Sequence, residues 1–263
     1  MDKTLEHPHR FMKYLRQERL PHIFCPGCGN GVVLNTIFNA IELSDKSFDN
    51  ISMVSGIGCS SRIPGYVKCD SLHTTHGRAI AYATGLKIAN PKQDIVVVCI
   101  NNDIYGMTGG QISPTSPEGS YATTAPYGST DQPFNISAVV KAAGASFVAK
   151  YTTAQPMQVS EAIKQGLENK GFSFIEVVSQ CPTYYGRKNR MKTPITMLNW
   201  FKENTITLEK AKDMSSDELK GKIITGIYVN KPRKEYVDSI EEVIKEHSDI
   251  DPDENINKAY MGD

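Results

Sequence analysis

The chain has 263 residues, of which 40% are hydrophobic and 22% charged, and its 29 basic residues balance its 29 acidic residues. These values exclude a disordered chain, and the net charge of zero argues against binding to nucleic acid or another polyanion. The longest apolar run, 95–100, is far shorter than the roughly 20 residues that span a bilayer. Residues 1–20 lack the apolar core of a secretory signal, so we expect a cytoplasmic protein without a membrane segment.

The hydrophobic pattern predicts a single α/β layer structure. In chain order, the pattern predicts helices at 31–43, 77–89, 136–143, 156–167, 196–203 and 234–246, and strands at 51–55, 95–100, 145–150 and 172–178. Asn30 is expected to cap the first helix. The 95–100 strand is apolar on both faces, which is typical of a parallel sheet buried between helices. Residues 101–135 are rich in Gly, Pro, Ser and Thr and predict a long ordered loop.

Two regions are therefore expected. Residues 1–190 form an α/β domain with a mostly parallel sheet flanked by helices. Residues 191–263 form a C-terminal helical extension or arm, and its last dozen residues are acidic and rich in Asn.

Four of the six cysteines are candidate ligands. Cys25 and Cys28 stand two residues apart before a helix, a spacing found in zinc sites, iron–sulfur sites and redox disulfides. Cys59 and Cys181 each follow a predicted strand, and the carboxyl ends of parallel strands meet at one edge of a sheet. If the Cys25 loop folds over that edge, the four thiols converge.

Two other interpretations stay open at this point. One is a Cys25/Cys28 dithiol with structural cysteines elsewhere, as in a thiol–disulfide oxidoreductase. The other is a zinc-stabilised binding protein. We expect Cys69 and Cys99 to act as small hydrophobic residues, because Cys99 lies inside an apolar strand.

Five motifs resemble, in order, the β subunit of 2-oxoacid:ferredoxin oxidoreductases. They are 24–29 (FCPGCG), 54–60 (VSGIGCS), 73–79 (HTTHGRA), 101–111 (NNDIYGMTGGQ) and 113–115 (SPT). The resemblance extends over about residues 10–245, and the run 66–91 with its paired histidines is most similar to the 2-oxoglutarate branch.

The resemblance implies a thiamine-diphosphate-binding fold and an enzyme that works as part of a heteromeric complex. Its reaction is the oxidative decarboxylation of 2-oxoglutarate, with thiamine diphosphate as the electron sink. Coenzyme A takes the acyl group as succinyl-CoA, and the electrons leave singly through a [4Fe–4S] cluster to ferredoxin. An α subunit is implied as a partner, because it supplies the other half of the thiamine site.

The resemblance also implies residue roles. Cys25, Cys28, Cys59 and Cys181 would hold the [4Fe–4S] cluster. The turn with Gly58, Ser60 and Ser61 would point its amides at the diphosphate. His76 and Thr108 would contact the diphosphate, unless His76 simply caps the helix that follows it. Mg²⁺ would take the Asn102 side chain and the Ile104 carbonyl as ligands.

Charged residues near these motifs are weaker candidates. Arg62 would act catalytically by pairing with the substrate carboxylate, or would be an ordinary surface arginine. Met107 joins Arg62 as a candidate for substrate choice. Arg187, Lys188 and Arg190 would attract an acidic ferredoxin or keep a loop soluble, and we favour solubility.

The sequence departs from the family pattern at one place. It contains no Gly-Asp-Gly, whose Asp supplies a further Mg²⁺ ligand, and one βα unit is expected to be missing between Val98 and Cys99. Asp94 precedes the strand and Asp103 belongs to the wrong part of the motif. An incomplete sequence, a natural electron-transfer subunit that binds the cluster but not thiamine diphosphate, and metal binding rescued elsewhere are the alternatives. We favour the first, since losing a central unit exposes apolar strand edges.

Overall fold

The computed structural model describes residues 9–93 and 95–248. The first residues of the 1–20 segment, Asp94 and the acidic end of the chain lie outside these ranges. Within them, no helix is both long and apolar enough to cross a membrane.

The described residues form the following elements. The helices are α1 (Gly29–Leu43), α2 (Ala79–Ala89), α3 (Ile136–Ala142), α4 (Pro156–Glu168), α5 (Pro194–Asn204), α6 (Leu208–Ala211), α7 (Ser216–Leu219) and α8 (Tyr236–His247). Short 3-10 or π turns are η1 (Arg10–Tyr14), η2 (Gln17–Arg19), η3 (Phe48–Asn50), η4 (Ser60–Tyr66) and η5 (Pro182–Gly186). The strands are β1 (Ser52–Ser55), β2 (Asp70–His73), β3 (Val97–Asn101), β4 (Ile104–Tyr105), β5 (Gln111–Ile112), β6 (Phe147–Thr152), β7 (Ser173–Val178), β8 (Thr205–Thr207) and β9 (Ile223–Asn230).

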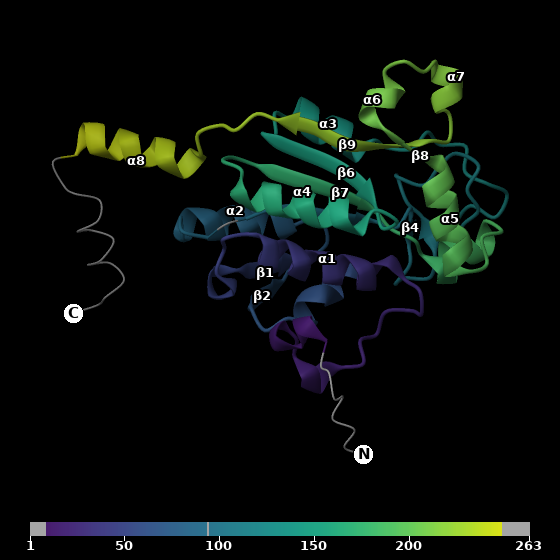
Figure 1. Cartoon of the computed structure of the whole chain (residues 1–263), viewed down its shortest axis with the longest axis horizontal. Coiled ribbons are helices and arrows are strands. Elements are labelled where there is room, and N and C mark those ends of the chain that lie inside the picture. The colour runs from purple at the N-terminus through teal and green to yellow at the C-terminus, as the bar shows by residue number, and fades with distance from the viewer. Residues whose placement is uncertain (1–8, 94, 249–263) are drawn as a thin grey trace.

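A five-stranded sheet in the order β3-β7-β6-β9-β8 forms the centre of the molecule (Figure 1). The first three strands are parallel, and β9 runs antiparallel to β6. Alternate residues of β6 and β7 face α1 and α4, where Phe147 and Ile175 join Val33, Val159 and Ile163 in one core. The opposite face packs against α3. The prediction of an α/β fold with a mostly parallel sheet flanked by helices is confirmed.

β1 and β2 form a separate two-stranded parallel sheet beside α1 (Figure 1). A second core lies under this part, where Phe11 and Phe38 pack with Ile63 and Val67. Thus the strands that precede α2 and the strands that follow it do not pair with one another.

Three local predictions are corrected. Helix α1 begins at Gly29, because the Gly29 N–H donates to the Gln180 carbonyl at 3.0 Å, so Cys28 is the N-cap and Asn30 is buried inside the first turn. Helix α2 begins at Ala79, not at 77, because Gly77 has φ +65°, outside the helical region. His76 therefore does not cap it.

Two larger regions also differ from expectation. The 101–135 segment contains the β4–β5 hairpin within its loop. Contrary to the prediction of a helical extension after residue 190, β8 and β9 join the main sheet. β9 is rich in β-branched residues that pack on α3 and β6. The stretches of sequence on either side of it are polar, so its strand pattern is not recognised from the sequence. Helix α8 lies apart from the sheet (Figure 1), and Glu235, which precedes α8, forms a 3.0 Å ion pair with Lys87 of α2.

Candidate functional site

Four cysteines from three distant segments lie together at one edge of the molecule. A Cβ atom placed on Gly106 would lie 3.5 Å from the Cys59 sulfur and 3.6 Å from the Cys181 sulfur. Charge repulsion from Cys25, Cys59 and Cys181 contributes to a raised pKa at Cys28, so these thiols are electrostatic neighbours. The structure therefore brings together all four cysteines proposed as cluster ligands.

The turn from Cys25 to Cys28 is held on the end of β7. The Cys28 N–H donates to the Cys25 carbonyl at 3.0 Å, and Gly27 takes φ +76°, a conformation that favours glycine. The Gln180 side chain donates to the Gly27 carbonyl at 3.2 Å. Gln180 is 2% exposed and accepts a short hydrogen bond from Thr153. Because Gln180 precedes Cys181, this clamp sets the distance between the two cysteine segments.

The four thiols differ in exposure: Cys181 is buried, Cys28 and Cys59 are half-buried, and Cys25 is exposed. Burial is the largest cause of the raised pKa of Cys28, which reaches about 11, and repulsion from the other cysteines adds to it. Burial and repulsion from Cys181 and Cys25 likewise raise the pKa of Cys59. Four thiolates together are therefore disfavoured unless a cation compensates their charge.

Among residues 9–93 and 95–248, no group of three or more His, Cys, Asp or Glu side chains is arranged closely enough to hold a metal ion. A Cβ atom on Gly106 would be in ordinary van der Waals contact with the Cys59 and Cys181 sulfurs. Four cysteine thiols are a ligand set that both zinc and an iron–sulfur cluster use, so the cluster stays a prediction.

Cys69 and Cys99 lie elsewhere. Cys69 is buried in the core beneath β1 and β2, and Cys99 lies within β3, where Glu176 and Lys150 influence its pKa. Both thiols have pKa values raised mainly by burial. Their positions agree with packing roles.

The Asn102 side chain carries an unsatisfied acceptor. Its Oδ1 atom is buried and has no hydrogen-bond partner. A buried amide oxygen without a donor is costly, and a hard cation would satisfy it. Ile104 is 6% exposed and begins the β4–β5 hairpin two residues later. The pair therefore fits the predicted Mg²⁺ ligands, whereas no residue was found for the Asp that Gly-Asp-Gly would supply.

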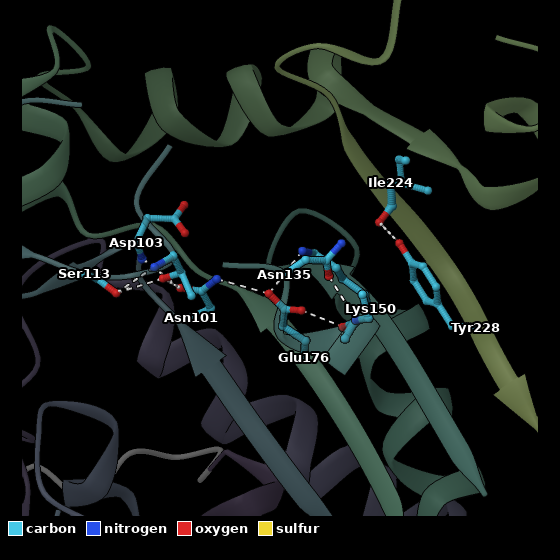
Figure 2. A network of polar contacts seen from close by, with 11 residues as sticks. Asn101, Asp103, Ser113, Asn135, Lys150, Glu176, Ile224 and Tyr228 are labelled. Carbon is cyan, nitrogen blue, oxygen red and sulfur yellow. Dashed lines mark hydrogen bonds and ion pairs between the residues drawn. The ribbon is translucent and has the colours of Figure 1, made fainter. Parts of the chain in front are cut away.

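A buried polar network fixes the backbone beside Asn102 (Figure 2). The Asn101 Nδ2 atom donates to Glu176 Oε1 at 3.1 Å, and Lys150 Nζ lies 3.1 Å from the same oxygen. Asn101 Oδ1 in turn accepts from the Asp103 N–H at 3.1 Å and from the Thr115 hydroxyl at 2.8 Å. The network anchors the 102–103 turn to the sheet.

The predicted diphosphate turn lies at the end of β1. Gly58 has φ +139°, and nothing lies within 4 Å of the Cβ that it lacks. Ser60 and Ser61 open η4 and are partly buried. The Ser55 hydroxyl donates to the Ser61 carbonyl at 3.1 Å and lies 3.0 Å from His73 Nδ1, which braces this turn.

The remaining candidates are on the surface. His76, Arg62 and Thr108 are exposed, and the described structure gives Arg62 no carboxylate partner. The Thr108 hydroxyl donates to the side-chain oxygen of Gln111 at 2.6 Å. The side-chain amide of Gln111 in turn donates to the Thr108 carbonyl at 2.8 Å. Met107 is 41% exposed. Arg187, Lys188 and Arg190 are also exposed, which both a solubility role and attraction of an acidic partner require.

Sequence reasoning missed three residues of this region. Gln180, Gly106 and His73 all act through contacts between segments far apart in the chain, so no local spacing identifies them. The sequence offers one signal for two of them, which is their position: Gln180 adjoins Cys181, and His73 is the first residue of the 73–79 motif.

Comparison with known proteins gives matches over nearly the whole chain. A family model described as thiamine pyrophosphate enzyme, C-terminal TPP binding domain, matches residues 92–177. The 2-oxoglutarate synthase subunit KorB of Methanothermobacter marburgensis is 57% identical, with 96% of this chain and 98% of the relative covered. The KorB subunit of Methanocaldococcus jannaschii is 52% identical over 90% of this chain and 98% of the relative.

A solved structure agrees. The 2-oxoglutarate:ferredoxin oxidoreductase of Magnetococcus marinus, with 2-oxoglutarate, coenzyme A and succinyl-CoA bound, superposes with a TM-score of 0.77 at 27% identity. The match covers 95% of this chain and 96% of that one.

Proposed function

We propose that this chain, which belongs to the family of 2-oxoglutarate synthase KorB subunits, is the β subunit of a 2-oxoglutarate:ferredoxin oxidoreductase. The observation that carries the proposal is the 57% identity to a KorB subunit over 96% of this chain. The convergence of four thiols and the unsatisfied Asn102 oxygen support it from the structure.

In the proposed reaction, 2-oxoglutarate and coenzyme A give succinyl-CoA and carbon dioxide, and two electrons pass singly to two oxidised ferredoxins. Bound thiamine diphosphate supplies the electron sink for the decarboxylation. The chain's own part is to hold and orient: Asn102 and the Ile104 carbonyl would hold Mg²⁺, and Gly58, Ser60, Ser61, His76 and Thr108 would hold the diphosphate. Arg62 would orient a substrate carboxylate.

The thiols of Cys25, Cys28, Cys59 and Cys181 would hold a [4Fe–4S] cluster. Iron would displace the thiol protons, and its charge would offset the burial and repulsion that raise the pKa values of Cys28 and Cys59. The buried Cys181 and the clamp at Gln180 would keep water from the cluster.

Partner subunits follow from membership in a multi-subunit enzyme family. We propose an α subunit that completes the thiamine site, a ferredoxin that accepts the electrons, and a cytoplasmic location.

The absent Gly-Asp-Gly favours a second candidate, an electron-transfer subunit with the cluster but without thiamine diphosphate. The alignment to the Methanothermobacter marburgensis relative has 283 positions, more than this chain's 263 residues, so that relative contains residues without a counterpart in this chain. Unmatched residues of this kind are what a missing βα unit requires. We still favour the full enzyme subunit, with the unit missing from an incomplete sequence.

The test is the content of bound groups per chain after anaerobic purification with the natural partner. Thiamine diphosphate is measured by thiochrome fluorescence, and iron and acid-labile sulfide by colorimetry. We expect about one thiamine diphosphate and about four irons and four sulfides per chain, as the cubane requires. Cys69→Ser is the matched control and should leave the iron content unchanged, whereas Cys59→Ser should lower it.

The contrary outcomes are distinct. Iron and sulfide without thiamine diphosphate would leave only the electron-transfer subunit. Zinc in place of iron, or no metal at all, would overturn both candidates.

A further inference from the structure

A concentration of positive charge follows Cys181. Residues 177–202 contain five basic residues and no acidic one, although the whole chain carries equal numbers of both. Four of the five are exposed and lie within 187–192, a segment that we call the basic loop: Arg187, Lys188, Arg190 and Lys192. Within the part of the chain that the structure describes, no ion pair joins any of these four to a carboxylate. The charge of the basic loop is therefore not neutralised there.

The backbone of the basic loop is held in one geometry by Asn189. The Asn189 Nδ2 atom donates to the Tyr121 carbonyl at 3.0 Å and to the Tyr185 carbonyl at 2.9 Å. The Asn189 Oδ1 atom accepts from the Tyr121 N–H at 2.8 Å. On the other side of Asn189, the Met191 N–H donates to the Gly186 carbonyl at 2.8 Å. Charges that serve only solubility need no such clamp, because any exposed position suits them.

Arg190 has an unusual backbone conformation for its type. Its φ is 64°, and Asp103 is the one other non-glycine residue with positive φ among the residues described by the structure. An arginine pays a conformational cost in this region that glycine avoids. Costs of this kind persist mainly where the residue has a function. The conformation therefore favours a specific role for the Arg190 side chain over a role in solubility alone.

The base of the basic loop stands beside the thiols. The Gly186 N–H donates to the Cys181 carbonyl at 2.9 Å. Tyr184 fills the space between them and the hairpin region, since a Cβ atom on Gly110 would lie 2.6 Å from its ring. A Cβ atom on Gly106 would lie 3.9 Å from the same ring and 3.6 Å from the Cys181 sulfur. A protein that docks on the basic loop is thus brought close to the cysteines.

The charges are arranged for a large partner. Exposed, hydrated cations hold a single small anion weakly, because water screens each contact. A protein with many carboxylates meets several of these cations at once, and their combined field steers it during its approach. Tyr121, which Asn189 holds beside the basic loop, is 45% exposed and offers the aromatic contact that is common at protein interfaces. The chemistry therefore fits an acidic protein surface.

We propose that the basic loop is the docking surface for an acidic electron-carrier protein, the ferredoxin of the proposed function. The proposal rests on that function and adds the place at which the acceptor binds. The sequence by itself favours solubility for these charges. The Asn189 clamp, the left-handed Arg190 and the contact with the Cys181 backbone reverse that preference, because a soluble loop requires none of them.

The first test measures how fast a purified small ferredoxin with a strongly negative net charge, in its oxidised state, associates with the natural complex. The double variant Lys188→Glu with Arg190→Glu should lower the association rate constant at least about tenfold at low salt, because steering is lost. The difference should disappear at about 1 M salt, where the Debye length is only about 3 Å. Iron content per chain checks that the variant is loaded.

The matched control is the double variant Lys231→Glu with Arg233→Glu. These two residues are also basic, exposed and two positions apart. They lie just before α8, at the opposite end of the molecule from α5, which follows the basic loop (Figure 1). The control changes the net charge by the same amount, so it should leave the association rate constant within about twofold of the parent.

A second test separates the charge of Arg190 from its backbone conformation. Arg190→Gly relieves the conformational cost and removes the charge, and we expect slower association without a loss of stability. Arg190→Lys keeps both the charge and the cost, and should associate like the parent at low salt. If the residue served only the shape of the loop, Arg190→Gly would associate as fast as the parent.

The outcomes separate this proposal from the proposed function. Equal association of both double variants and the parent overturns the docking surface, while reduction of ferredoxin by the same complex leaves the enzyme function standing. Loss of the partner subunit from the Lys188→Glu/Arg190→Glu complex in gel filtration also overturns it, because that subunit would then cover the loop. Since oxidised ferredoxin binds without turnover, a complex that docks it through the loop but forms no succinyl-CoA contradicts the enzyme function alone.

Discussion

Asp103 occupies an unusual position for a charged residue. It has φ 56°, in the left-handed region that few residues other than Gly, Asn and Asp adopt. Burial raises the pKa of its carboxyl group to about 7, and the nearby Glu176 adds to the rise while Lys150 opposes it. The folded chain therefore keeps a proton that the unfolded chain releases at lower pH. Stability from this group is complete below about pH 4 and is lost as pH rises to about 7.

Asp103→Asn should remove this pH dependence, since Asn keeps the shape and tolerates the left-handed backbone. We expect the free energy of unfolding at pH 8 to increase by on the order of 2 kcal/mol, because a pKa unit corresponds to about 1.4 kcal/mol and solvent screening reduces the full shift. The gain should vanish near pH 4. Urea denaturation of the cluster-free chain at both pH values measures it. The exposed Asp131→Asn is the control, and an equal gain at both pH values would refute the assignment.

Strands β6 and β7 are joined by charge as well as by backbone hydrogen bonds. Lys150 and Glu176 are direct neighbours across the two strands, and Glu176 is 1% exposed. Ser137 of α3 donates to Glu176 at 2.6 Å, and Asn101 of β3 donates at 3.1 Å (Figure 2). One carboxylate thus connects four elements under the loop that carries Asn102.

Removing the cation alone should be costly, because the buried carboxylate loses its charged partner. We expect Lys150→Met to lower the free energy of unfolding by about 3 kcal/mol. In the double variant with Glu176→Gln, the loss should be smaller than the sum of the single losses by at least about 1 kcal/mol. The Lys164–Glu168 pair of α4, 3.8 Å apart and more exposed than Lys150–Glu176, is the matched control, for which Lys164→Met should cost at most about 0.5 kcal/mol. Additive losses at 150 and 176 would contradict the coupling.

The predictability of an element depended on how local its signal is. Helices α1 and α4 and strand β7 carry their periodicity within one stretch of sequence, and all three were predicted within a few residues. β9 was missed because its partner β6 lies far away in the chain and its neighbours are polar. The same holds for the site: the Cys25–Cys28 spacing is local, whereas the Gln180 clamp and the Gly106 space exist only after folding.

Of the three sheets of the described residues, the β1-β2 sheet and the five-stranded sheet share no strand pairing, and the four cysteines span these two. Cys59 follows β1 of the small sheet, Cys181 follows β7 of the large one, and Cys25 and Cys28 precede α1, which packs on both cores. A group that bonds all four thiols would act as a cross-link between these two sheets. Cross-links that close long loops stabilise by restricting the unfolded chain.

Cluster assembly should therefore stabilise the fold as a whole. We expect anaerobic reconstitution with iron and sulfide to raise the free energy of unfolding by about 4 kcal/mol, the order expected for cross-linking a loop of about 100 residues. The gain should disappear in Cys59→Ser and in Gly106→Ala, whose added methyl group would lie 3.5 Å from the Cys59 sulfur and fill the space between the thiols. Cys69→Ser, in the core beneath β1, should unfold more easily before and after reconstitution but keep the same gain. Chemical denaturation with and without reconstitution measures each gain. If Cys59→Ser gained as much as Cys69→Ser, the added stability would come from iron bound elsewhere, and the two sheets would be held together by packing alone.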